Sequence, residues 1–209
     1  MAVNIERIQC AFRIVHIDNV EHIAKYGITK RNSANRNNNY ISIGDTAVIR
    51  TREQKCFIEN KSIVEYIPFY FGPRSVMLYV IQSGYNSVER VDPQDIVYCV
   101  VKLETIISNN VSCVFTDGHA LNKITKQYPG TELINIDKII RYDDVYARNW
   151  IDENDLDKKR RKEAELLVEQ DIPVDYIAGY VVYNQTAKDK LLKIGIQSEK
   201  IVIKPQYYF

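Results

Sequence analysis

The chain has 209 residues, of which 45% are hydrophobic and 26% charged, and its formal net charge is +1. Such a composition is typical of a globular protein with a sizeable core. The near-zero net charge excludes a protein that binds nucleic acid through bulk positive charge, so any polyanion site must be a local patch.

The first half of the chain predicts strands around one short helix and one loop. CAFRIVHI (10–17) alternates and predicts a strand. DNVEHIAKYG (18–27) predicts a helix, because Asp18 with Glu21 resembles a capping box and Gly27 ends it. RNSANRNNNY (31–40) is half asparagine and predicts a loop. Four apolar runs then predict strands: TAVIRT (46–51), SIVEYIPFYF (62–71), VMLYVIQSG (76–84) and DIVYCVVKL (95–103).

The second half of the chain mixes strands and helices. NNVSCVFTDGHA (109–120) predicts a strand that ends in an Asp-Gly turn, and the spacing in ALNKITKQY (120–128) indicates a helix. YIAGYVVYN (176–184) and KIVIKPQYYF (200–209) predict late strands around the helix TAKDKLLKIG (186–195). With no repeat, linker or regular βαβ alternation, the pattern predicts one α+β domain over 1–209.

Several kinds of site have no support in the sequence. No apolar run approaches the roughly 18 residues that cross a bilayer, and MAVNIERIQC at the start has no long apolar stretch. We therefore expect a cytoplasmic protein that binds no membrane. The cysteines at 10, 56, 99 and 113 are scattered, so we expect reduced, mostly buried thiols and no metal site. Neither a phosphate-binding loop nor G-x-G-x-x-G occurs.

The segment KKRRKEAELLVEQ (158–170) has two interpretations. Its composition favours a helix, whereas ELLVEQ is equally compatible with a strand, and Arg161 and Glu165 share a face in either state because they are four residues apart. Glu163 and Glu165 share a face only in a strand. The alternative to a functional site is a solvated surface helix with ion pairs four residues apart.

Three other stretches contain candidate functional residues. In IPFYFGPRSVMLYVI, Arg74 follows a bend at Gly72 and can clamp a phosphate or carboxylate, or be a surface residue of a tight turn. FTDGHA places His119 at a strand end, where it is either catalytic or structural. HIDN (16–19) is a strand-to-helix junction that either offers N–H groups to an anion or ribose or only caps the helix.

Together these stretches resemble the DarT-type DNA ADP-ribosyltransferase toxins. The resemblance spans about 12–184 and lies in the order of HIDNVEHIAKYGI, IPFYFGPRSVMLY, VFTDGHA and YARNWIDENDLDKKRRKEAELLV. It implies an ADP-ribosyltransferase-like fold, with a central mixed or antiparallel split β-sheet and flanking helices. Two positions depart from the family pattern: Arg13 stands where a histidine is usual, and Glu163 where a glutamine is common.

The resemblance also implies a reaction and its residues. NAD is the substrate that donates ADP-ribose to a base of single-stranded DNA, with thymine preferred over guanine, and no metal takes part. Glu165 matches the catalytic glutamate and Arg74 the essential arginine that binds NAD. The other residues implied for NAD are Arg13, His16, Asn19 and Tyr70. Those expected at the DNA are His119, Tyr146, Arg148 and Trp150, and the Asn-rich loop is expected to fold over NAD. Arg161 is added at the DNA from its spacing alone: on the same face as Glu165, it is expected to polarise the base.

A toxin of this type implies a macrodomain antitoxin of the DarG type as its partner, with growth arrest or phage defence as the outcome. Two other functions stay open. One is an ADP-ribosyltransferase for guanine, RNA or protein, which the Glu-x-Glu pair at 163 and 165 favours. The other is a nucleic-acid-binding module without catalysis.

Overall fold

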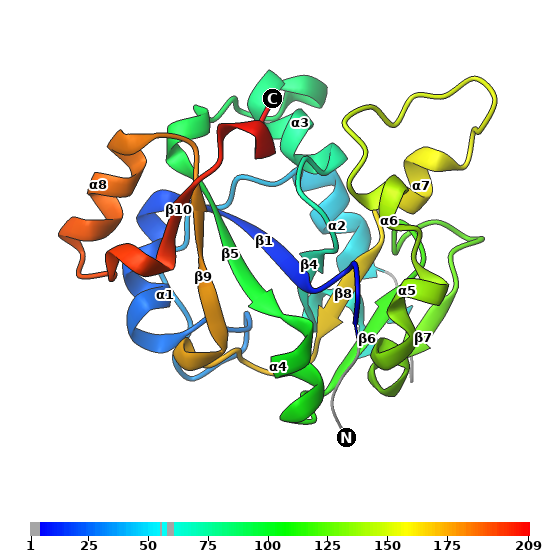
Figure 1. Cartoon of the computed structure of the whole chain (residues 1–209), viewed down its shortest axis with the longest axis horizontal. Coiled ribbons are helices and arrows are strands. Elements are labelled where there is room, and N and C mark those ends of the chain that lie inside the picture. Colours follow the sequence, from blue (N-terminus) through cyan, green and yellow to red (C-terminus); the bar gives the residue numbers. More distant parts are fainter. Residues whose placement is uncertain (1–4, 55, 58–60) are drawn as a thin grey trace.

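The computed structural model describes residues 5–54, 56–57 and 61–209, and its centre is one twisted β-sheet (Figure 1). Residues 1–4 and the side chain of Cys56, which the sequence predictions included, lie outside the described residues. The strands are β1 (Cys10–His16), β2 (Cys56–Phe57), β3 (Lys61–Ser62), β4 (Ile67–Tyr70), β5 (Ile96–Lys102), β6 (Cys113–Thr116), β7 (Gln127–Pro129), β8 (Glu165–Val168), β9 (Ile177–Val182) and β10 (Ile201–Ile203).

The sheet runs in the order β10-β9-β5-β1-β4-β8-β6-β7, and only β9 and β10 pair in parallel. It is split in the middle. β1 pairs with β5 along its whole length, from Cys10 to His16, but with β4 only through Phe12 and Tyr70. The predicted α+β class and split, mostly antiparallel sheet are therefore confirmed.

Helices flank this sheet. Those of the described residues are α1 (Val20–Tyr26), α2 (Thr46–Gln54), α3 (Val76–Ser83), α4 (Leu103–Ser108), α5 (Ile136–Ile139), α6 (Tyr142–Val145), α7 (Lys158–Lys162) and α8 (Gln185–Lys193). α1 and α8 lie beside β9 and β10, whereas α5, α6 and α7 lie at the opposite end of the sheet (Figure 1). No helix among the described residues is long and apolar enough to span a bilayer.

The sheet is covered on both faces, because the strands alternate between two cores. Along β1, Ala11 and Val15 belong to the larger core, whereas Phe12 packs with Leu78 of α3 and Tyr98 of β5 in the smaller one. Side chains of successive strand residues point to opposite faces, so an apolar run such as β5 supplies both cores. This arrangement explains why the central strands are so uniformly apolar.

Two of the predicted strands are wrong. TAVIRT forms α2, which begins after Asp45, whose carboxylate accepts hydrogen bonds from the backbone N–H groups of Ala47 and Val48. VMLYVIQSG forms α3, which Ser75 caps by accepting a bond from the N–H of Leu78 and Gly84 ends with φ of 67°. An apolar run of this length fits a buried helix as well as a buried strand, and the caps decide between them.

Three further segments differ from prediction. ALNKITKQY forms turns and the short strand β7 instead of a helix. SIVEYIPFYF is not one strand: Ser62 ends β3, a 3-10 turn follows over Ile63–Glu65, and the strand β4 begins at Ile67. KKRRKEAELLVEQ divides into α7 and β8, so Arg161 and Glu165 do not share the face of one element. The helix after β1 is confirmed as α1, but the expected capping box is absent: His16 caps the 3-10 turn Ile17–Asn19 that precedes α1, and the N-cap of α1, Asn19, makes no side-chain capping bond.

Candidate functional site

Glu165 is the first residue of β8 and is completely buried. One carboxylate oxygen accepts a hydrogen bond from the guanidinium of Arg52 on α2 at 2.5 Å, and the other accepts one from the backbone N–H of Ala120 at 3.1 Å. Tyr70 of β4 stands directly opposite in the sheet, so its side chain and that of Glu165 share one face. The carboxylate is therefore fixed by contacts from two sides.

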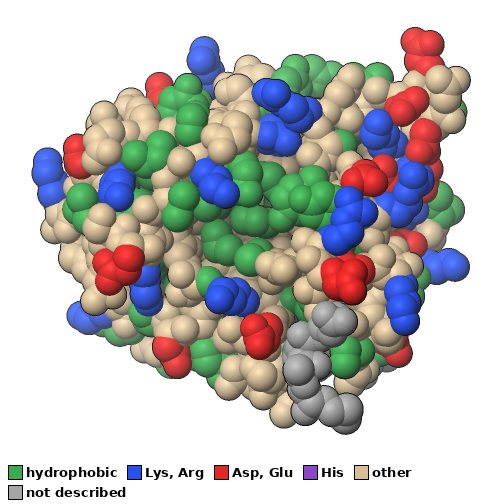
Figure 2. Space-filling model, in the orientation of Figure 1, with side chains coloured by type: hydrophobic (Ala, Val, Ile, Leu, Met, Phe, Trp, Pro, Cys, Tyr) green, Lys and Arg blue, Asp and Glu red, His purple; other side chains and the backbone are tan. Residues whose placement is uncertain are grey.

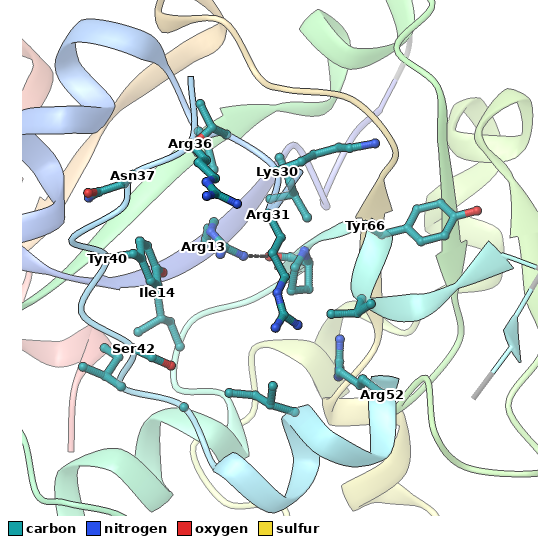
Figure 3. Close-up of a pocket in the computed structure, with 18 of the residues that line it drawn as sticks. Arg13, Ile14, Lys30, Arg31, Arg36, Asn37, Tyr40, Ser42, Arg52 and Tyr66 are labelled. Carbon is teal, nitrogen blue, oxygen red and sulfur yellow. Dashed lines mark hydrogen bonds between the residues drawn. The ribbon is translucent and has the colours of Figure 1, made fainter. Parts of the chain in front are cut away.

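A hollow of about 770 Å³ opens beside the split between β1 and β4 (Figure 3). We call it the basic hollow. Its polar lining includes Arg13, His22, Lys30, Arg31, Arg36, Asn37, Asn38, Tyr40, Arg52, Glu53, Tyr66 and Tyr70. Its volume lies within the range of roughly 300–1,000 Å³ that small-molecule sites occupy.

The positive charge of this hollow exceeds its negative charge. Arg52 is neutralised by Glu165, and Arg31 forms an ion pair with Glu53. Arg13 donates to the carbonyl oxygen of Pro68 across the split, at 3.0 Å. In Figure 3, Arg13, Arg31, Arg36 and Arg52 approach the hollow from β1, the Asn-rich loop and α2. This charge balance suits an anionic ligand such as a pyrophosphate.

A second hollow, of about 1240 Å³, opens next to the first. We call it the aromatic groove. Its lining includes Val76, Met77, Tyr79, Tyr85, His119, Leu121, Ile124, Arg148, Trp150, Ile151, Leu156, Lys159, Glu163 and Phe209. Apolar side chains combined with cations are what a single strand of nucleic acid requires of its binding surface.

Glu165 lies between the two hollows. Arg52, which binds one of its oxygens, lines the basic hollow. Ala120, which binds the other, stands between His119 and Leu121, and both of these line the aromatic groove. Residues that bind the Glu165 carboxylate therefore border both hollows, although Glu165 itself is buried and lines neither.

Glu163 belongs to the aromatic groove. Burial, followed by the nearby Glu165 carboxylate, raises the pKa of Glu163 to about 7. A substantial fraction of this carboxyl is therefore protonated at neutral pH, and a protonated carboxyl can donate a hydrogen bond. The Glu-x-Glu pair thus has two environments, with Glu165 paired to a cation and Glu163 at a groove.

Arg74 lies elsewhere than expected. It is 9% exposed, has a positive φ of 51°, and lines neither hollow. Its guanidinium donates to the carbonyl oxygens of Gln206 and Tyr146. Burial, followed by the charge of Arg148, lowers the pKa of Arg74. The structure therefore does not bring Arg74 and Glu165 to a shared cavity, and the cation beside Glu165 is Arg52.

The remaining residues expected at NAD fall into two groups. Arg13 and Tyr70 line the basic hollow. His16 and Asn19 do not, although Asn19 supports the wall of that hollow. Its buried amide bonds both the N–H and the carbonyl oxygen of Ile41, at 2.9 and 2.8 Å, and so holds the end of the Asn-rich loop.

The residues expected at DNA also divide. His119, Arg148 and Trp150 line the aromatic groove. Tyr146 instead stacks on Tyr142, with ring centroids 4.3 Å apart. Arg161 is bound by three carboxylates: those of Asp144, Asp155 and Asp157. Figure 2 has the orientation of Figure 1, in which α6 and α7 lie on the right, and it shows acidic and basic side chains close together on that side of the surface.

Arg52 is the functional residue that sequence reasoning missed. Its segment was interpreted as a strand that ends at Thr51, so no helix directed a side chain toward Glu165. The available signal was Asp45 before TAVIRTREQ, an N-cap followed by a helix-compatible run. Among the described residues no group of His, Cys, Asp and Glu is arranged to hold a metal ion.

Comparisons with known proteins bear on this site. The sequence model of a family described as "ssDNA thymidine ADP-ribosyltransferase, DarT" matches residues 12–209. A DNA ADP-ribosyl transferase of Escherichia coli O127:H6 is 33% identical over 183 residues, which cover 86% of this chain and 83% of that one. Its counterpart from Thermus sp. is 27% identical, with 95% of each chain covered.

Solved structures also resemble this chain. That of Thermus sp. 2.9 DarT in complex with ADP-ribosylated ssDNA superposes with a TM-score of 0.82 at 26% identity, and covers 96% of each chain. The predicted ADP-ribosyltransferase-like fold and enzyme class are confirmed. The chain therefore belongs to the DarT family of single-stranded DNA ADP-ribosyltransferases.

Proposed function

We propose that this chain, acting as one domain over 1–209, transfers ADP-ribose from NAD to a thymine base of single-stranded DNA and releases nicotinamide. The observation that carries the proposal is the position of Glu165, whose two oxygens are held from the basic hollow and from the edge of the aromatic groove. An enzyme that joins two substrates needs one reacting group within reach of both.

NAD is assigned to the basic hollow. Lys30, Arg31 and Arg36 offer charge for its pyrophosphate, Arg13 lies at the split, and Tyr70 stands opposite Glu165. The solved Thermus sp. 2.9 and Thermosipho africanus relatives include complexes with NAD+ and with ADP-ribose. The Asn-rich loop supplies part of the wall, which supports its proposed closure over NAD. His16 and Asn19 act as positioning residues that hold the ends of this region.

The reaction breaks the bond between C1′ of the ribose and the nicotinamide nitrogen, and forms a bond between C1′ and a thymine ring nitrogen. Positive charge develops on the ribose as nicotinamide leaves, and the Glu165 carboxylate stabilises it. The thymine nitrogen must lose its proton, which Glu165 accepts and passes to solvent. Arg52 fixes the orientation of the carboxylate throughout.

DNA is assigned to the aromatic groove. Arg148 meets phosphate, Trp150 stacks on a base, and His119 lies beside the Ala120 N–H that holds Glu165. Arg74 and Tyr146 do not contact DNA. They position the groove wall, because the Arg74 guanidinium binds the carbonyl oxygen of Tyr146 at the start of the loop 147–157.

Mass spectrometry of oligonucleotides tests the proposal. The protein is incubated with NAD and single-stranded DNA in which thymine occurs once, and fragmentation of the product locates the adduct. We expect one added ADP-ribose on that thymine and one nicotinamide released per adduct. Parallel samples contain thymine-free DNA with guanine, RNA or protein. An adduct confined to one of these acceptors contradicts the thymine assignment, and no nicotinamide release at all supports a non-catalytic module.

Arg161 is expected to position the substrate loop and not to polarise the base. Its guanidinium donates to the carboxylates of Asp144 on α6 and of Asp155 and Asp157 at the end of the loop 147–157, and so connects the two segments. Arg161→Gln should therefore raise KM for the oligonucleotide about ten-fold, leave KM for NAD unchanged, and cost about 2 kcal/mol of stability. Kinetics with each substrate varied in turn, together with thermal unfolding, measure these effects.

The matched control is Arg7→Gln, which removes another arginine–aspartate pair, with Asp143, away from both hollows. It should resemble the wild type in both KM values. A fall in kcat with an unchanged KM for the oligonucleotide would instead support direct action of Arg161 on the base.

A partner and a location complete the proposal. A Thermosipho africanus relative, 28% identical over 200 residues, is a DNA ADP-ribosyl transferase fused to a DNA ADP-ribosyl glycohydrolase. This fusion supports a macrodomain antitoxin of the DarG type that removes the modification made by this chain. We assign both proteins to the cytoplasm, where bacterial DNA is accessible.

A further inference from the structure

Three aromatic rings meet at one end of the aromatic groove. Tyr79 of α3, Trp150 of the loop 147–157, and Phe209 pack edge to face, with ring centroids 5.5–5.6 Å apart. All three line the groove, and Tyr79 and Phe209 remain 41% and 44% exposed. Because Tyr79 and Phe209 are exposed and none of the three pairs is stacked, part of their ring surface is available to a ligand that stacks.

Large apolar side chains surround this aromatic trio. Ile124, Ile151 and Leu156 line the same groove and are among the most exposed hydrophobic residues described, at 68%, 75% and 89%. Exposed apolar groups gathered in one hollow mark a binding surface. Arg148 and Lys159 lie in the same lining.

This combination selects a class of ligand. Unpaired bases present apolar faces that stack on aromatic rings, while the phosphates that link them require cations. The groove also includes His119 and Glu163, which stand near Glu165 in space or sequence. A strand whose thymine reaches Glu165 can therefore continue along the rest of this lining.

We propose that the aromatic trio of Tyr79, Trp150 and Phe209 is a subsite for the base of a nucleotide that flanks the modified thymine. Tyr79 and Phe209 are then specificity-determining residues that set which flanking positions must carry a base. The inference rests on the proposed function, because it assumes that single-stranded DNA occupies the aromatic groove.

The experiment uses the full chain, saturating NAD, and oligonucleotides with a single thymine. Each oligonucleotide lacks the base at one position, and the set covers successive positions on both sides of the thymine. With the wild-type protein, we expect one abasic position to lower kcat/KM about ten-fold, which is the scale of one base–aromatic contact. Abasic sites at distant positions should change it less than about three-fold.

The variant Tyr79→Ala identifies the protein partner of that base. It should lower kcat/KM for the intact oligonucleotide about ten-fold, abolish the penalty at the sensitive position, and leave KM for NAD unchanged. Tyr79→Phe retains the ring and should restore the wild-type pattern. The control is Tyr26→Ala, because Tyr26 is equally exposed, at 42%, but lines neither hollow.

The outcomes separate the two levels of the proposal. Equal rates for every abasic oligonucleotide, measured on the wild-type protein alone, overturn the subsite but not the transfer reaction. A penalty that persists unchanged in Tyr79→Ala also overturns it. The absence of any adduct with any oligonucleotide overturns the proposed function and the subsite together.

Discussion

Glu165→Gln is expected to lower the rate of ADP-ribose transfer by about 10³-fold or more while the protein stays folded. The amide has the shape of the carboxylate, and its oxygen can still accept the N–H of Ala120, although its NH2 group then faces the Arg52 guanidinium and that ion pair is lost. The amide carries no negative charge for the ribose and is a very weak base. Nicotinamide release and adduct formation should fall together, because both need bond cleavage at C1′.

The measurement is single-turnover adduct formation, with calorimetry to show that the variant still binds NAD. Glu169→Gln is the matched control. Glu169 follows β8 directly, is partly exposed, and binds Lys61 and Ser112 away from both hollows. It should keep wild-type activity. A Glu165→Gln variant within ten-fold of wild type would contradict the assignment of Glu165 as the catalytic residue.

The sequence allowed the turns around this site to be predicted, because their signals are local. Gly72 and the prolines mark the bend before Arg74, and the Asp-Gly turn marks the end of β6. The identity of Glu165 came from resemblance, since the charge run alone is compatible with an exposed helix. What the structure adds is that α7 ends at Lys162 and β8 begins at Glu165, so that Glu165 enters the sheet and becomes buried.

The ion pair between Arg52 and Glu165 could not be predicted from local sequence patterns. Arg52 is 113 residues away in sequence, and it reaches the carboxylate only because α2 is a helix. The burial of Arg74 could not be predicted from the sequence either. Arg74 stands two residues before α3, where it looks free to face a ligand, but its guanidinium donates to two backbone carbonyls from distant segments. Burial of this kind depends on the tertiary fold and leaves no periodic signal.

Gly72→Ala is expected to have the largest effect on stability, because the backbone at residue 72 touches another segment of the chain. A Cβ at this position would lie 2.0 Å from the carbonyl oxygen of Val145 and 2.7 Å from its carbon. Both atoms are backbone and cannot rotate away. The buried Nζ of Lys162 donates to the carbonyl oxygens of Pro73 and Val145, so it ties the same two segments together.

The added methyl group must separate these segments, which should cost about 3 kcal/mol and lower Tm by roughly 10 °C. Transfer activity should fall as well, because the bend at 72–74 and the start of the loop 147–157 would move apart. Gly44→Ala is the control, since its Cβ would meet only the Ile49 side chain, at an ordinary 3.6 Å. The test is the Tm of both variants, measured by thermal unfolding. If Gly72→Ala has the same Tm as Gly44→Ala, the close packing of the bend against Val145 does not stabilise the site.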